Sequence, residues 1–328
     1  MRRTVYYDSG TSNSRLFLLD GAGEPVYAAK KHVGSRDSAI TGSNTVLING
    51  LYELYSEMLE KCNLQDSDIE NIYASGMITS PFGMHEVPHL ELPLTLEHYA
   101  ESLVPFCETA KFNRDIILIP GAKTMNRDFA FVNNTRGEEI EAVGVLADLG
   151  ATLDARPVAV VFPGSHTHAV LLRDQSLAGL LCHFTGELFE ALRKETILAP
   201  ILNVKLESYD MDMVKMAIAN LAIYGFNRAL YIGHAMQIFR EYRPEQRKSY
   251  IEGVLAGGVG QSLAHYFHNQ WFGCSAVAIV ADGMIGDLYQ TILEETDCAQ
   301  TILRLHPDKD KSYGLKGMWR LLQLRQKG

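Results

Sequence analysis

Two segments of this chain share one pattern, in which an apolar run, a short polar turn with a glycine, and a second apolar run follow one another. The first segment spans residues 4–19, TVYYDSGTSNSRLFLL, and the second spans residues 158–172, VAVVFPGSHTHAVLL. Apolar runs rich in aromatic and β-branched residues on both sides of a polar turn predict a β-hairpin. One such hairpin opens each half of the chain, which favours two domains of similar architecture.

The length of the chain agrees with a division into two domains. A single hydrophobic core stops growing at about 250–300 residues, and this chain has 328. Apolar residues make up 47% and charged residues 21%, the mixture of an ordinary globular protein. Turn-forming and charged residues at positions 150–157, GATLDARP, mark the expected boundary. We therefore predict an N-terminal domain over residues 1–153 and a C-terminal domain over residues 154–328.

Charge and cysteine usage exclude several classes of protein. The formal net charge is −9 and no dense run of Lys or Arg occurs, which argues against a nucleic-acid partner and against an anionic membrane surface. No signal-peptide pattern and no run of about 18 apolar residues is found, so we expect a soluble, cytoplasmic protein. The five cysteines form no C-x-x-C pair and the histidines no H-E-x-x-H pattern, so neither a metal centre nor a redox centre is predicted.

Periodicity along the rest of the chain alternates between strand and helix. Apolar residues recur at helical spacing in several long segments, one of which should break near Gly225 or Gly233. The predicted helices cover residues 45–63, 136–150, 187–198, 212–242, 245–267 and 282–295. Strands are expected, besides the two hairpins, over residues 26–33, 68–78, 115–123 and 275–281. This order predicts the α/β class.

The turn of the first hairpin has the composition of a phosphate site. Small residues let a backbone approach phosphate oxygens closely, and their N–H and O–H groups can donate to them; here they are Ser9, Gly10, Thr11 and Ser12. Asp8 could hold Mg²⁺ through water, because Mg²⁺ keeps most of its hydration shell. Arg15 adds a rigid fork for an anion. A capped hairpin with a surface arginine would show the same residues.

The turn of the second hairpin offers a second phosphate loop. Its polar residues are Gly164, Ser165, His166 and Thr167. Two such loops suit the transfer of a phosphoryl group, where catalysis consists mostly of positioning and neutralising charge. The histidines here could equally be hydrogen-bonded structural side chains, which we prefer for His168.

Two further segments complete a kinase-like set. A hydroxyl nucleophile needs a group that accepts its proton, and Glu138, at the predicted start of a helix, is our candidate general base. Glu139 is expected to cap or orient that helix, and both acids would also be explained by the helix dipole alone. The strand-to-helix turn near residue 283 is a place where a flat ring can lie against backbone, and we predict the adenosine site there, at Ala281, Asp282, Gly283 and Met284.

In this order the motifs DSGTSNSR, ASGMITS, IPGAKT, RGEEIEAVG, FPGSHTHAV, FTGELFEAL and VADGM resemble the 2-dehydro-3-deoxygalactonokinase family of sugar-acid kinases, over residues 4–295. The resemblance implies two RNase H-like domains of the actin, Hsp70 and sugar kinase superfamily, with a cleft between them. It also implies ATP and Mg²⁺ as cofactors, with phosphate moved to the 6-hydroxyl of 2-dehydro-3-deoxy-D-galactonate or a related sugar acid.

The resemblance also assigns roles to individual residues. Asp8 attends the metal, Gly10 to Asn13 hold one side of the phosphates, and Gly164 to Thr167 hold the other. A loop that faces the sugar acid is matched by Gly76, Met77, Thr79 and Ser80. Thr185, Gly186 and Glu187 match a second segment near the substrate.

Two alternatives stay open on the sequence. Both substrates of the kinase are anions, so we expect Arg15, Arg136 and Lys123 to face the cleft. The same scaffold could instead serve a non-catalytic sensor of nucleotide or sugar acid, and this chain has His168 and Ala169 where the family usually has a Lys-Trp pair. A homodimer is expected only from the general frequency of symmetric dimers.

Overall fold

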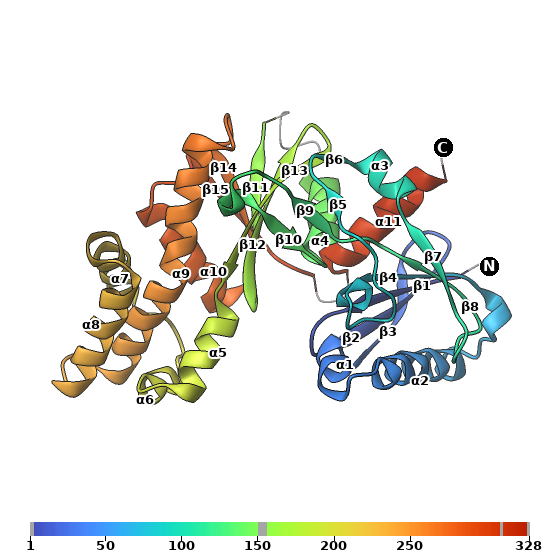
Figure 1. Cartoon of the computed structure of the whole chain (residues 1–328), viewed down its shortest axis with the longest axis horizontal. Coiled ribbons are helices and arrows are strands. Elements are labelled where there is room, and N and C mark those ends of the chain that lie inside the picture. Colours follow the sequence, from blue (N-terminus) through green and yellow to red (C-terminus); the bar gives the residue numbers. More distant parts are fainter. Residues whose placement is uncertain (1–2, 150–155, 309–310, 327–328) are drawn as a thin grey trace. The chain divides into compact units, whose positions relative to one another are not determined.

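A computed structural model describes residues 3–149, 156–308 and 311–326 (Figure 1). The chain divides into two compact units. The first consists of Met1–Thr152, Gln175–Leu180 and Asp308–Gly328, and the second of Leu153–Asp174 and Leu181–Pro307. In the described residues no helix is both long enough and apolar enough to cross a membrane.

The first unit is built on a mixed six-stranded sheet. Its order across the sheet is β3 (Pro25–Lys31), β2 (Ser14–Leu19), β1 (Arg3–Ser9), β4 (Ile69–Gly76), β8 (Arg114–Leu118) and β7 (Val104–Glu108). The first three strands pair antiparallel, β1, β4 and β8 pair parallel, and β7 is antiparallel to β8. Strand β1 lies in the middle and is buried along most of its length, so the end of β1 is held on both sides.

Helices and a small sheet cover and extend this core. The helices are α1 (Ser35–Thr41), α2 (Thr45–Lys61), α3 (Leu96–Glu101) and α4 (Glu138–Leu149), with 3₁₀ turns at Asp66–Asp68, Met77–Thr79 and Phe129–Phe131. The small sheet has the order β10 (Asn133–Thr135), β9 (Ala122–Thr124) and β5 (Leu90–Glu91). The apolar stripe of α2, including Leu47, Leu51 and Met58, lies in one core with Val5 and Leu16 of the sheet, as the helical spacing predicted.

The second unit is built on another six-stranded sheet, in the order β15 (Thr301–Leu305), β14 (Ala276–Val280), β11 (Val158–Phe162), β12 (His166–Arg173), β13 (Ser176–Phe184) and β6 (Leu94–Thr95). Five of its strands, β13, β12, β11, β14 and β15, repeat the order of β3, β2, β1, β4 and β8, whereas β6 and the Ser176–Leu180 part of β13 belong to the first unit. Strands β11 and β12 are antiparallel, and β11, β14 and β15 are parallel. The two predicted hairpins, β1–β2 and β11–β12, therefore occupy equivalent places in two similar sheets.

The helices of the second unit follow the predicted order. They are α5 (Gly186–Glu195), α6 (Ala199–Leu202), α7 (Met211–Tyr224), α8 (Phe226–Ile238), α9 (Pro244–Asn269) and α10 (Gly283–Glu295). The expected break falls at Gly225, which has φ +75° and a conformation that glycine adopts without strain. Gly233 stays inside α8, where its missing side chain lets the helix pack against Ile251 and Tyr250 of α9.

The C-terminal helix corrects the predicted domain division. Residues 154–328 were expected to form one domain, but α11 (Tyr313–Arg325) belongs to the first unit and packs along α4. A Cβ on Gly144 or on Gly317 would overlap a backbone carbonyl of the other helix, so glycines permit this close contact. The boundary itself, predicted near residues 150–157, falls mainly on residues 150–155, outside the described part of the chain.

Candidate active site

The first hairpin turn is held by hydrogen bonds from behind. The Gly10 N–H donates to the Asn13 carbonyl at 2.8 Å and closes the turn. Below it the hydroxyls of Ser9 and Ser14, both fully buried, lie 2.8 Å apart, and Ser14 donates to the Val33 carbonyl at 2.9 Å. Ser9 and Ser14 are thus structural, and the turn itself presents the remaining polar groups.

Two glycines from other segments press against this turn. A Cβ on Gly34 would lie 2.6 Å from the Gly10 carbonyl oxygen, and one on Gly76 would lie 2.6 Å from the Ser9 carbonyl oxygen. The Arg36 N–H also donates to the Thr11 carbonyl at 2.9 Å. Consequently the turn is fixed in place. A preordered turn binds phosphate more tightly, because no binding free energy is spent on ordering the loop.

The exposed side of the turn fits the phosphate assignment. No hydrogen bond of the Thr11 or Ser12 hydroxyl is found among the described residues, so both can donate to a ligand. The Asn13 side chain lies 3.2 Å from a ring nitrogen of His32. Sequence reasoning did not select His32, since it lies beyond the next strand and only the hairpin register brings it here.

Asp8 lies at the end of β1 beside one cation. In the β1–β2 register it faces Arg15, and one of its carboxylate oxygens is 3.5 Å from an Arg15 guanidinium nitrogen. Burial raises the pKa of Asp8, Arg15 lowers it in part, and Glu138 raises it further. Asp8 and Glu138, distant in the sequence, are therefore close enough to repel each other.

Glu138 occupies the first position of α4, as predicted. The Thr135 hydroxyl donates to its carboxylate at 2.5 Å and orients it. The neighbouring Glu139 turns the other way, is almost fully buried, and accepts from the Gly137 N–H at 2.8 and 2.9 Å. Burial and the charge of Glu138 raise the pKa of Glu139 to about 8. Its contacts fit the capping role that we expected for it.

Glu141 is a third acid of this helix that the sequence reasoning missed. It lies one helical turn after Glu138, and burial together with the charges of Asp8 and Glu138 raises its pKa to about 8. A Cβ on Gly314 of α11 would lie 3.7 Å from the Glu141 side chain, so α11 comes close to it. The helical spacing from Glu138 was visible in the sequence, but nothing there showed that this face points towards Asp8.

The donor set around Asp8 fits water-mediated Mg²⁺ and not a closed metal cage. Among the described residues, no group of three or more His, Cys, Asp or Glu side chains could hold a metal ion directly. Mg²⁺ commonly uses one or two carboxylates, water and substrate phosphates. The raised pKa values of Asp8 and Glu141 reflect burial and an excess of negative charge, which a bound cation would relieve.

Arg136 is a fixed guanidinium. It donates to the Thr79 hydroxyl at 2.6 Å and to the Val87 carbonyl at 2.8 Å, and it lies 3.3 Å from a ring nitrogen of His89. Thr79 is completely buried and Ser80 nearly so. The Thr79 hydroxyl therefore holds Arg136, and the Ser80 hydroxyl donates to the Met77 carbonyl within the loop. Neither is presented to solvent as the hydroxyl of a substrate-facing residue would be. Gly76, with φ +84°, is where β4 turns into this loop.

The second hairpin differs in one detail from its prediction. The turn contains Pro163, Gly164 and Ser165, whereas His166 and Thr167 already belong to β12, since antiparallel pairing begins earlier than the polar composition suggested. The turn is tied to the start of α5, because Gly186 N–H donates to the Gly164 carbonyl at 3.3 Å and Glu187 N–H to the Ser165 carbonyl at 2.8 Å.

Side chains of the second hairpin are partly engaged within the protein. The Thr167 hydroxyl is buried and lies 2.9 Å from that of Thr185, which in turn donates to the Gly164 carbonyl at 3.3 Å. His166 forms a contact of 2.8 Å with the Glu187 carboxylate. Thr185 thus shapes the turn, and Glu187 extends from the first turn of α5 beside it.

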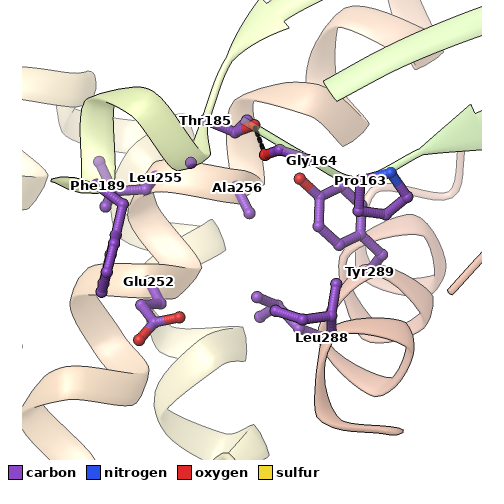
Figure 2. Close-up of a pocket in the computed structure, with 11 residues that line it drawn as sticks. Pro163, Gly164, Thr185, Phe189, Glu252, Leu255, Ala256, Leu288 and Tyr289 are labelled. Carbon is purple, nitrogen blue, oxygen red and sulfur yellow. Dashed lines mark hydrogen bonds between the residues drawn. The ribbon is translucent and has the colours of Figure 1, made fainter. Parts of the chain in front are cut away.

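A cavity of about 250 Å³ opens next to this turn (Figure 2). Its walls come from the hairpin turn and from α5, α9 and α10, and they are mostly apolar: Pro163, Gly164, Thr185, Gly186, Phe189, Glu252, Leu255, Ala256, Ile285, Leu288 and Tyr289. Glu252 is the charged residue among them, and the Tyr209 hydroxyl donates to it at 2.5 Å.

The predicted adenosine segment, residues 281–284, directly precedes Ile285, which lines this cavity. None of residues 281–284 is among the cavity's lining residues; the same helix contributes Ile285, Leu288 and Tyr289 instead. Gly283 starts α10 with φ +52°, and the Asp282 carboxylate pairs with His306. The sequence pattern located the turn, but only the packing of three helices shows where the hollow is.

Comparison with known proteins gives the family of this chain. A model of the family 2-keto-3-deoxy-galactonokinase matches residues 8–320. The chain belongs to this kinase family. The resemblance noted from the motifs is therefore confirmed over nearly the whole chain, including α11 up to residue 320, which the motif comparison did not reach.

Relatives agree in fold along the full length. The chain is 26% identical over 303 residues to the probable 2-dehydro-3-deoxygalactonokinase DgoK1 of Rhizobium meliloti (strain 1021), covering 90% of each protein. It is also similar to the crystal structure of a provisionally assigned 2-dehydro-3-deoxygalactonokinase protein from Sinorhizobium meliloti, with a TM-score of 0.77, 21% identity, and coverage of 100% and 99% of the two chains.

A more distant structure shares the architecture. It is component A of the Acidaminococcus fermentans (R)-2-hydroxyglutaryl-CoA dehydratase, with a TM-score of 0.52, 13% identity and 99% coverage of both chains. Together with the two sheets of repeated strand order, these likenesses confirm the predicted α/β fold with actin-like ATPase domains.

Proposed function

We propose that this chain uses ATP to phosphorylate the 6-hydroxyl of 2-dehydro-3-deoxy-D-galactonate or a closely related keto-deoxy sugar acid. Membership of the kinase family supports the reaction class. The observation that carries the proposal is the carboxylate of Glu138, which Thr135 orients and which is close enough to Asp8 to raise the pKa of Asp8. A pure binding protein would not need a second acid at that place.

Glu138 is the general base of the proposed reaction. In the proposal it accepts the proton of the sugar hydroxyl while that oxygen attacks the terminal phosphorus, so the new P–O bond forms as the bond to the leaving ADP oxygen breaks. Asp8 is the residue that would hold hydrated Mg²⁺, and the ion would neutralise phosphate charge. Arg15 beside Asp8 lowers the pKa of Asp8 in part, which favours the charged form of that carboxylate.

Each hairpin turn is the proposed phosphate-binding element of its own unit, and the cavity beside the second turn is the proposed nucleoside site. In the first unit the N–H groups of Thr11 to Asn13 and the hydroxyls of Thr11 and Ser12 are the proposed donors to phosphate oxygens, and in the second unit they are those of Gly164 and Ser165. The base of the nucleotide enters the cavity beside Gly164, where Phe189 and Leu288 offer apolar surface. Arg136, held rigid by Thr79, is the cation proposed to pair with the sugar-acid carboxylate.

The test is a coupled assay of ADP release with ATP, Mg²⁺ and a panel of sugar acids that includes the galactonate compound and its gluconate epimer. Substrate-dependent release identifies the kinase and its preferred acid. ATP binding without release from any acid would instead indicate the sensor.

Two variants test the assigned roles. Glu138→Gln should lower kcat by about 10²–10⁴-fold while ATP still binds, since positioned general bases contribute that much. Asp8→Asn should raise the Mg²⁺ concentration needed for half-maximal turnover. The matched control is Glu101→Gln on the exposed surface of α3, which should leave kcat unchanged. Near-normal turnover of Glu138→Gln removes Glu138 from the base role.

A further inference from the structure

An unusual concentration of exposed apolar side chains lies along α8 and its two ends. We call this the α8 surface: Ile223, Tyr224, Phe226, Tyr231, Ile238, Phe239 and Tyr242, each 37–73% exposed. It comprises seven of the eighteen exposed large hydrophobic residues of the described chain, within twenty positions. Figure 1 shows α7 and α8 on the side of α9 away from the sheet of their own unit.

Tyr231 and Ile238 are on the face of α8 opposite to its packed face, while Ile223 and Tyr224 end α7, Phe226 begins α8, and Phe239 and Tyr242 follow its end. Ala229, Gly233 and Met236 are buried in contact with the rest of the unit. Tyr231 and Ile238 are seven residues apart, which is two helical turns, so their side chains point the same way, opposite to the buried residues Ala229, Gly233 and Met236. Ala235, four residues after Tyr231 and three before Ile238, is the small residue on the same face. Such a row is the pattern of a helix that packs against a second helix.

The size of the α8 surface also calls for a partner. A large aromatic or aliphatic side chain contributes roughly 150–250 Å², so seven that are about half exposed offer on the order of 700 Å². Monomeric proteins seldom expose apolar patches above about 300–600 Å², and a stable interface needs about 800 Å² from each partner. The α8 surface is therefore close to one half of a dimer interface.

The charges favour a second copy of this chain. Between Phe226 and Phe239 the only charged residue is Arg228, whose guanidinium lies 5.7 Å from the centre of the Tyr231 ring. Two α8 helices that meet antiparallel, centred between positions 234 and 235, place Tyr231 opposite the partner subunit's Ile238. The same arrangement brings Arg228 to the end of the partner subunit's α8, where Glu241 follows in the turn after Ile238, so opposite charges can meet at both ends of a two-fold interface.

We propose that the chain forms a two-fold homodimer through the α8 surface, with the two α8 helices antiparallel. The proposal does not depend on the kinase reaction, because the α8 surface contains none of the residues assigned to the active site. The interface is depleted of charge at its centre and has Arg228 and Glu241 at its rim, the usual distribution in stable interfaces.

Sedimentation of the full chain tests the proposal. The wild type should sediment at twice the 36.5 kDa of one chain, and Ile238→Glu should weaken the dimer dissociation constant by at least about 100-fold, since a charge would be buried at the centre. Ile197→Glu is the matched control, being 66% exposed in the same unit but outside the α8 surface; it should remain a dimer. Unchanged circular dichroism would show that both variants are folded.

A charge exchange tests the antiparallel register. Arg228→Glu and Glu241→Arg should each weaken the dimer several-fold, and the double variant should restore it. A wild type that stays a monomer at high micromolar concentration overturns the proposal, as does a dimer that Ile238→Glu leaves intact. A double variant weaker than both single ones overturns the antiparallel arrangement. Kinase activity measured on the same samples keeps this outcome separate from that of the proposed function.

Discussion

Replacing Gly317 by alanine should loosen the contact between α4 and α11 and, with it, the position of Glu138. A Cβ built on Gly317 would lie about 1 Å inside the 3.0 Å separation that real Cβ atoms keep, and the atom that it meets is the backbone carbonyl oxygen of Ile140. Backbone cannot rotate away as the end of a long side chain can. Since Ile140 is two residues after Glu138, α11 must move outward or the start of α4 must shift.

The expected magnitude follows from two opposing effects. Alanine in a helix interior is more favourable than glycine by about 0.8–1.0 kcal/mol, whereas overpacking a tight contact costs roughly 1–3 kcal/mol or more. With backbone as the obstacle the cost should lie at the upper end, so we expect a net loss of about 1–2 kcal/mol in the free energy of unfolding of the first unit. A shift of the base by a fraction of an ångström should also reduce kcat by about 10-fold or more.

The assay is urea unfolding followed by tryptophan fluorescence. The two tryptophans are Trp271 and Trp319, and Trp319 lies on α11, so a Trp271→Phe background makes the signal specific for the first unit. Gly258→Ala is the control, because Gly258 is in helix α9 and a Cβ there would meet nothing within 4 Å. This control is measured with Trp271 retained and Trp319 replaced by Phe, so that the emission reports the second unit, and it should be neutral or more stable. A Gly317→Ala protein that is as stable and as active as the wild type would refute the packing argument.

Two other substitutions probe the site. The folded-state pKa values of Glu139 and Glu141 are raised from 4.5 to about 8, so the folded protein holds protons that the unfolded chain releases. The free energy of unfolding should therefore fall as the pH rises from about 4.5 to about 8. In Glu141→Gln the urea midpoint should fall less steeply over the same pH range. An equal pH dependence in both proteins would contradict the burial of Glu141. Gly34→Ala should raise the KM for ATP by about 10-fold, because its Cβ displaces the first hairpin turn. Gly21→Ala is the control and should leave the KM unchanged, since a Cβ there would meet nothing within 4 Å. An unchanged KM in Gly34→Ala would mean that the turn tolerates the movement.

Local chemistry accounts for what was predicted well. The hairpins at β1–β2 and β11–β12 could be recognised because strand patterning and turn residues are neighbours in the chain. The same holds for the end of α7, where Gly225 alone supplies the positive φ. Glu138 could be placed at a helix start for the same reason. Order along the chain then sufficed to recognise the family, since its motifs recur in one sequence of strands, turns and helices.

Contacts between distant segments account for what was missed. Nothing near residues 313–325 shows that this helix packs on α4, because that contact depends on glycines at 144 and 317 in two separate segments. Likewise the sequence predicts that Thr79 faces the substrate, whereas in the structure its hydroxyl accepts a hydrogen bond from Arg136.

The sequence by itself determined the α/β class, the two hairpin turns and the acid at the start of α4, because each depends on residues within a few positions of one another. Only the tertiary structure decided that Glu141 and Glu138 share their environment with Asp8, where the cavity beside Gly164 lies, and which face of α8 is left uncovered. Those features are set by which buried surfaces meet, and burial free energy depends on shape and on the whole core, not on the order of residues in any one segment.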